Sequence, residues 1–106
     1  MKEEYKALPL VKNEAIHHFE LTVEGHTAFI DYKESGTKIW LIHTESPAEL
    51  EGKGVATALI EKTLVYLEEH HYTLVPLCPL VHAYLKRHPE WQRLLDPSVK
   101  PFNPPL

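Results

Sequence analysis

The sequence predicts one α/β domain with a mixed sheet over residues 1–106, and three observations carry this prediction. Residues 16–33 hold two segments in which apolar and polar side chains alternate, as they do in half-buried strands. Residues 53–70 place apolar side chains at helical spacing. Residues 72–78 form a nearly unbroken apolar run, which is typical of a strand covered on both faces. A chain of 106 residues suffices for one hydrophobic core.

The first strands are expected to form an antiparallel meander of three, after an N-terminal segment of residues 1–14. The alternating apolar positions of the first two strands are Phe19, Leu21, Val23, Ala28, Ile30 and Tyr32. Between these strands Gly25 can adopt the positive φ that a tight hairpin turn requires. A second polar turn, residues 34–37, leads into a third strand at 38–44.

A strand-helix-strand unit is expected next. The apolar stripe of the helix consists of Ala56, Leu59, Ile60, Leu64 and Leu67. Strands joined through such a helix are almost always parallel, so we expect 38–44 and 72–78 to run in the same direction. Pro76 has no N–H to donate to a neighbouring strand. We therefore expect the pairing of these two strands to end near Pro76 and a gap to open between them.

The remaining residues predict short C-terminal helices and an extended tail. Pro79 stands at a favourable first position for a helix that runs to about His88, and Pro89 ends it. The segment 96–106 holds four prolines in eleven residues and should be extended, either docked or mobile.

Composition excludes several classes of function. The net charge is −4, and the 11 basic residues are scattered among 15 acidic ones, so no basic patch favours nucleic acid or an anionic membrane. A single cysteine excludes an internal disulfide, and the N-terminal residues lack the apolar core of a signal peptide. The eight histidines show no H-x-x-x-H spacing, so we expect no metal. A cytoplasmic protein is expected.

Two glycines flank Lys53 directly before the long helix. Glycine costs a helix about 1 kcal/mol relative to alanine, so a pair of them at a helix start serves the backbone conformation. Free amides and the positive end of the helix dipole make such a loop a candidate phosphate site. The spacing of the glycines and the residue after Lys53 exclude a P-loop. Thr57 stands where a dinucleotide-binding motif needs its third glycine. A flexible connection capped by glycine is the alternative.

Several motifs occur in the order found in the GNAT superfamily of N-acetyltransferases, and most closely in its small single-domain branch. These motifs are His43-Thr44-Glu45, Pro47, Gly52-Lys53-Gly54, Val75 to Cys78, and Tyr84 with Arg87 to Glu90. The sequence resembles this branch over roughly Phe19 to Leu95. The resemblance implies a minimal GNAT-like fold in which the fourth strand is parallel to the third and splayed from it.

The resemblance also implies a binding mode for acetyl-CoA. Its pyrophosphate would lie on the amides of Gly52 to Ala56, and its pantetheine arm between the two splayed strands. The implied cofactor-binding residues are Ile42, His43, Thr44, Gly52, Lys53, Gly54, Val55, Ala56, Thr57, Cys78, Tyr84, Arg87 and His88. Glu49 and Glu51 depart from the superfamily pattern, which has glutamine or arginine at the first position and commonly a basic residue at the second. These carboxylates weaken diphosphate binding unless they point to solvent.

Acetyl transfer to an amine requires a base for the amine proton and an acid for the leaving thiolate. His43 and Glu45 follow the strand beside the implied thioester, and either is a candidate base. Tyr84 is the candidate acid, since the superfamily commonly keeps a tyrosine near the CoA sulfur. Cys78 begins the second helix, where the helix dipole favours a thiolate. The cysteine can form a covalent acetyl-cysteine, line the cleft during direct transfer, or be an inert core residue.

The resemblance thus implies an acetyl-CoA-dependent N-acetyltransferase acting on an unidentified amine. The chain lacks the inserted helices and added C-terminal strands that build the acceptor pocket in larger members. The acceptor surface should therefore be open, suiting an exposed amine on a protein or polyamine, or be completed by a second subunit in a homodimer. The alternatives are a non-catalytic acyl-CoA sensor, or an interaction module that contacts a partner through Trp40, Trp91 or the Pro-rich tail.

Overall fold

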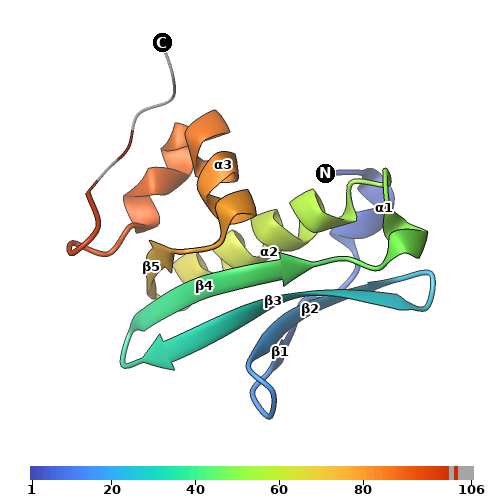
Figure 1. The fold of residues 1–106 in the computed structure, drawn as a ribbon, viewed down its shortest axis with the longest axis horizontal. Coiled ribbons are helices and arrows are strands. Elements are labelled where there is room, and N and C mark those ends of the chain that lie inside the picture. The colour runs from blue at the N-terminus through green and yellow to red at the C-terminus, as the bar shows by residue number, and fades with distance from the viewer. Residues whose placement is uncertain (101, 103–106) are drawn as a thin grey trace.

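The computed structural model describes residues 1–100 and 102, and in it a five-stranded mixed sheet packs against helices (Figure 1). The strands are β1 (Val11–Asn13), β2 (His18–Val23), β3 (His26–Ser35), β4 (Lys38–Glu45) and β5 (Thr73–Pro76). The helices are α1 (Glu3–Lys6), α2 (Val55–Glu69) and α3 (Pro79–Arg87), with 3-10 turns η1 (Ala48–Leu50) and η2 (Pro89–Leu94). The strand order is β1-β2-β3-β4-β5, antiparallel from β1 to β4 and parallel between β4 and β5. The predicted fold class is confirmed.

The alternation in the first strands places one face of the sheet against α2. All six apolar positions predicted for β2 and β3 are buried, and they join the stripe of α2 in one core cluster. On α2, Leu59, Ile60, Leu64 and Leu67 are buried as predicted, whereas Ala56 is only partly buried. The helix starts two residues later than predicted, because Gly54 takes a left-handed conformation with φ of 74°.

The N-terminal segment contributes two elements that the sequence does not predict. The short strand β1 pairs with β2 and extends the meander by one strand. The four-residue helix α1 buries Tyr5, whose side chain belongs to the main core cluster. Elements of three and four residues are too short to show a period of 2 or 3.6, so the hydrophobic pattern gives no signal for them.

The prediction that the last strand is covered on both faces is wrong. Leu74 and Pro76 are buried, but Thr73 and Val75 are only partly buried, and Leu77 is 59% exposed. Only one face of β5 packs against the core, so its burial alternates like that of a half-buried strand.

The segment after η2 packs along the outer edge of β5. Leu95 forms a parallel bridge with Leu74, and the Asp96 N–H donates to the Leu74 carbonyl over 2.9 Å. Phe102 stacks on His82 with ring centroids 4.1 Å apart. The described part of the tail is therefore docked, while residues 101 and 103–106 of the predicted tail lie outside the described residues. Among the described residues no helix has the length and apolar character needed to cross a membrane.

Candidate active site

Strands β4 and β5 separate halfway along β4, as Pro76 predicts. Their pairing runs from Lys38 opposite Thr73 to Leu41 opposite Pro76. Beyond that point the Leu41 carbonyl accepts the N–H groups of both Leu77, over 3.0 Å, and Cys78, over 2.8 Å. Strand β4 continues to Glu45 while the chain after Pro76 turns into α3. In the described structure, residues 42–45 of β4 thus have no β5 residue opposite them.

A β-bulge at Ile42 changes which side chains of β4 face the core. Tyr32 of β3 opposes Leu41, and Asp31 opposes His43, so Ile42 is an extra residue on β4. Without it, side chains would alternate strictly along the strand. With the bulge, Leu41 and Thr44 are both buried, while His43 is exposed. The bulge therefore directs Thr44 inward, toward the end of the gap between the strands.

Thr44 and Cys78 meet where the two strands have parted. The distance between Thr44 Oγ1 and Cys78 Sγ is 3.1 Å, and this hydrogen bond is buried. Cys78 is 1% exposed and forms the N-cap of α3, with Pro79 at the first helical position as predicted. Two residues predicted for the site are thus brought into direct contact across the gap.

His43 and Glu45 form a pair on the other side of β4. Two residues apart on a strand, they share one face, and His43 Nε2 lies 3.4 Å from Glu45 Oε1. Their side chains are 54% and 62% exposed, so both are accessible to an amine from solvent. The two predicted base candidates therefore lie side by side on one exposed face of β4.

Tyr84 lies on the buried side of α3 and is 4% exposed. Burial raises the pKa of its phenol, and the carboxylates of Glu61 and Glu90 raise this pKa further. The ring lies 4.4 Å from the ring of His88, which ends α3. The Tyr84 hydroxyl is accordingly protonated at neutral pH, as a proton donor must be.

The glycine loop has the backbone that its sequence predicts. Gly52 and Gly54 have φ angles of 76° and 74°, a region that residues with a Cβ rarely adopt. A Cβ built on either glycine would meet no heavy atom within 4 Å in the described structure. The glycines are therefore required by backbone conformation, and the space beside them is open.

Five amides at the start of α2 have no hydrogen-bond partner among the described residues. Within the described residues no acceptor is found for the N–H groups of Gly52, Gly54, Val55, Ala56 and Thr57. The first amide of α2 that has an acceptor is that of Ala58, which donates to the Gly54 carbonyl over 3.1 Å. The same five residues line a hollow of about 490 Å³. Unpaired amides at a helix N-terminus attract anions. Their donor set fits a diphosphate.

Lys53 differs from its neighbours in the loop. Its N–H donates to the Leu50 carbonyl over 3.2 Å, and its Nζ donates to Glu24 over 2.6 Å. This hydrogen bond raises the pKa of Lys53 and lowers that of Glu24. Both the amide and the ammonium group of Lys53 therefore already have partners within the protein.

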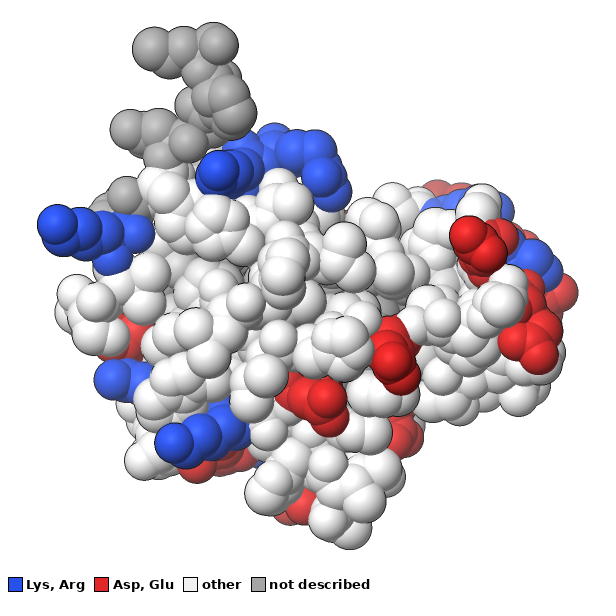
Figure 2. Space-filling model, in the orientation of Figure 1, with Lys and Arg blue, Asp and Glu red and all other residues white. Residues whose placement is uncertain are grey.

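The charged residues near the site are distributed unevenly. Glu49 and Glu51 are exposed; Glu49 lies 3.9 Å from His26 Nδ1, whereas Glu51 borders the hollow. Arg87 is exposed at the end of α3, and His88 Nδ1 lies 3.6 Å from a Glu90 carboxylate oxygen. Figure 2 shows acidic side chains, with basic ones among them, at the edge formed by α1 and η1, and basic side chains near α3.

Two contacts to the loop are missed by the sequence analysis. The Tyr5 hydroxyl donates to the Lys53 carbonyl over 2.9 Å, and Glu24 binds the Lys53 side chain. Tyr5 lies in a short charged segment and Glu24 in a hairpin turn, and neither has a motif that links it to residues so distant in the chain.

A comparison with known families agrees with this geometry. Residues 18–94 match the family described as GCN5-related N-acetyl-transferase. The match extends from β2 through η2 and includes the parted strands, the glycine loop and α3. It covers well over half of the 106 residues. The chain belongs to the GCN5-related N-acetyltransferase family.

Proposed function

We propose that this chain is an acetyl-CoA-dependent N-acetyltransferase acting on an exposed amine. The observation that carries the proposal is the set of five free amides around the hollow at the start of α2. A diphosphate would receive several N–H hydrogen bonds there, and the positive end of the α2 dipole would favour its charge. Glu51 opposes this charge from the border of the hollow and must turn to solvent when the diphosphate is bound.

The pantetheine arm is assigned to the gap between β4 and β5. Residues 42–45 have no β5 residue opposite them in the described structure, so their edge is available to the amide groups of the arm. Thr44 and Cys78 would line the inner end of this gap. Arg87 and His88 are assigned to the remaining phosphate, since both carry nitrogen donors at the end of α3.

The chemistry follows from the residues around the gap. Bound acetyl-CoA would supply the acetyl group as an activated thioester. The His43–Glu45 pair takes the proton from the attacking amine, because both side chains are exposed and lie 3.4 Å apart. Tyr84, whose phenol has a raised pKa, donates a proton to the departing sulfur.

We assign direct transfer to the amine in preference to a route through Cys78. The Cys78 sulfur is buried and hydrogen-bonded to Thr44, whereas reactive cysteines are partly exposed in electropositive surroundings. Cys78 would then line the gap. The accessible His43–Glu45 pair and the net charge of −4 favour a cationic amine that reaches the site from solvent.

An acetyl-transfer assay tests this proposal. Free thiol released from acetyl-CoA is followed in the presence of a polyamine, a lysine-containing peptide or a neutral primary amine. The double substitution His43→Gln with Glu45→Gln should lower kcat at least about 100-fold while acetyl-CoA still binds. His70→Gln, an exposed histidine at the opposite end of α2 from the glycine loop, is the control. Tight acetyl-CoA binding without turnover on any amine would make the chain an acyl-CoA sensor instead.

A further inference from the structure

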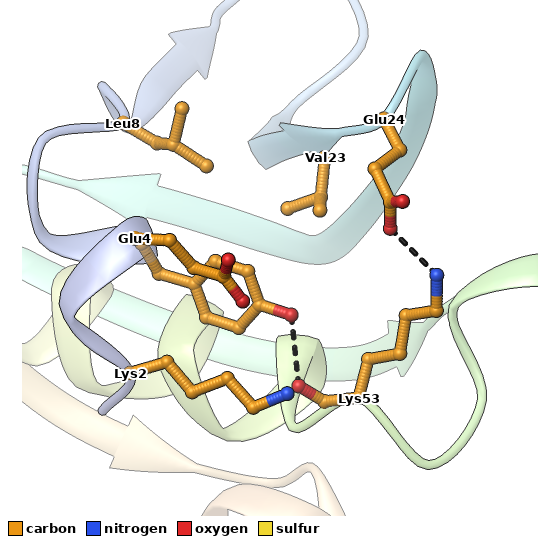
Figure 3. A pocket seen from close by; sticks show the side chains of 7 residues that line it. Lys2, Glu4, Leu8, Val23, Glu24 and Lys53 are labelled. Carbon is orange, nitrogen blue, oxygen red and sulfur yellow. Dashed lines mark hydrogen bonds and ion pairs between the residues drawn. The ribbon is translucent and has the colours of Figure 1, made fainter.

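Tyr5 connects the N-terminal segment to the glycine loop. Its side chain is 3% exposed and packs in the main core, and its hydroxyl donates to the Lys53 carbonyl (Figure 3). A four-residue helix such as α1 is unstable alone, so α1 depends on tertiary contacts, among them the burial of Tyr5 and the hydrogen bond from Lys62 Nζ to the Lys6 carbonyl. The family match begins at residue 18, so α1 lies outside it.

The Tyr5 hydrogen bond occupies the carbonyl that the Thr57 amide would use if α2 began one turn earlier. In a regular α-helix the Lys53 carbonyl would accept the N–H of Thr57, four residues later. Here the carbonyl accepts the Tyr5 hydroxyl, and Gly54 adopts a left-handed conformation that turns the chain into α2. The Thr57 amide has no acceptor within the described residues, and Thr57 lines the hollow. The Lys53 carbonyl thus bonds to Tyr5 in the same backbone conformation in which the Thr57 amide has no acceptor.

A second restraint acts on the same residue through its side chain. The Lys53 side chain reaches Glu24 in the β2–β3 turn, and together with Tyr5 these residues border a separate hollow of about 430 Å³ (Figure 3). Exposed ion pairs contribute little to stability, whereas a partly buried hydrogen bond from a fixed aromatic ring restrains its acceptor more strongly. Tyr5 is therefore the more effective of the two restraints.

We infer that Tyr5 is a positioning residue for coenzyme binding, which holds the Lys53 carbonyl out of α2 and so keeps the Thr57 amide free for phosphate oxygens, beside the free amides of Gly54, Val55 and Ala56. This inference rests on the proposed function of the glycine loop. It extends the binding site to α1, whose residues do not line the glycine hollow.

The test is Tyr5→Phe, which keeps the ring in the core and removes only the hydroxyl. Tyr72→Phe is the matched control, because its hydroxyl donates to Glu34 over 2.8 Å, away from the loop. In the ligand-free protein, Tyr5→Phe should shift the amide resonances of Gly54 to Thr57 and slow hydrogen exchange at Thr57, whose N–H regains the Lys53 carbonyl. Titrations should show acetyl-CoA and inorganic pyrophosphate bound about threefold to tenfold more weakly. Tyr72→Phe should change neither readout.

Unchanged loop resonances and unchanged affinity in a folded Tyr5→Phe variant would overturn the inference. Weaker binding of acetyl-CoA with unchanged binding of pyrophosphate would also overturn it, since the effect would then lie outside the loop. Failure of the proposed function looks different: the wild-type protein itself would bind neither probe.

Discussion

Gly54 is the residue on which the candidate phosphate site depends most. Its φ of 74° starts α2 in the left-handed region, and a side chain there would extend into open space. Gly54→Ala should lower the free energy of unfolding by about 1–2 kcal/mol through backbone strain. It should also weaken acetyl-CoA binding more than tenfold, because the added methyl group and the altered φ disturb the amide array. Urea unfolding and calorimetry measure the two effects.

Gly36→Ala provides the control for this prediction. Gly36 has a φ of 58° in the β3–β4 turn, and a Cβ there also meets nothing within 4 Å of the described atoms. The substitution should cost similar stability and leave acetyl-CoA affinity unchanged. Equal affinity losses in both variants would mean that Gly54 acts through global stability alone.

Cys78 decides between direct and covalent transfer. Because its sulfur is buried against Thr44, Cys78→Ser should retain turnover within about tenfold, as a hydroxyl can keep the hydrogen bond to Thr44 at some packing cost. Mass spectrometry of wild-type protein quenched during turnover should find no acetyl group on Cys78. An acetylated Cys78 together with an inactive serine variant would establish the covalent route.

The positions of some site residues can be predicted from the sequence, and those of others cannot. Cys78 and Tyr84 are placed by their position on a helix after a proline-interrupted strand, so local pattern suffices to locate both at α3. Whether Thr44 or His43 faces the core depends on the bulge at Ile42, which is fixed by packing between strands. The role of Tyr5 depends on a contact 48 residues away, which no local period encodes.

At the scale of elements, Asp96 joins the C-terminal segment to the sheet. Its carboxylate accepts hydrogen bonds from Ser98 and Thr73, and Lys38 Nζ lies 3.3 Å away. Hydrogen bonds from Ser98, then from Thr73, hold the pKa of Asp96 well below the ordinary value of 3.8. A lowered folded pKa stabilises the protein above the unfolded pKa, and this stabilisation is lost as pH falls below it toward the folded value.

Asp96→Asn should therefore lower Tm at pH 7 and lessen the fall of Tm between about pH 5 and pH 2. Thermal unfolding across this range measures both effects. Glu3→Gln, which removes an exposed carboxylate of α1, should leave the curve unchanged. Parallel curves for wild type and Asp96→Asn would show that the carboxylate contributes nothing through its ionisation.

The elements that were predicted are those with a clear hydrophobic period. Alternation runs through β2 and the first half of β3, and fifteen residues in α2 show a helical stripe, whereas β4 is marked by the apolar run 39–42 after a polar turn. The turn at Gly25 and the end of β5 at Pro76 follow from backbone chemistry. Strand β1 and helix α1 lack sufficient length for a period, and the exposure of Leu77 depends on what covers β5.

For the molecule as a whole, the net charge should affect the KM of the acceptor amine. The net charge is −4. The KM of a polyamine acceptor should rise severalfold as ionic strength increases from about 0.02 to 0.2 M, because salt screens long-range attraction. The KM of a neutral amine should not change with ionic strength. Initial rates at saturating acetyl-CoA measure this, and equal salt dependence for both acceptors would contradict the role of charge.

The family, the parted strands and the glycine loop together lead to one central claim, that the chain binds acetyl-CoA through the amides at the start of α2. Calorimetric titration of the purified protein with acetyl-CoA tests it most directly. We expect saturable binding of one molecule per chain, weakened by Gly54→Ala and not by Gly36→Ala. Absence of saturable binding up to millimolar acetyl-CoA, or equal binding by both glycine variants, would contradict it.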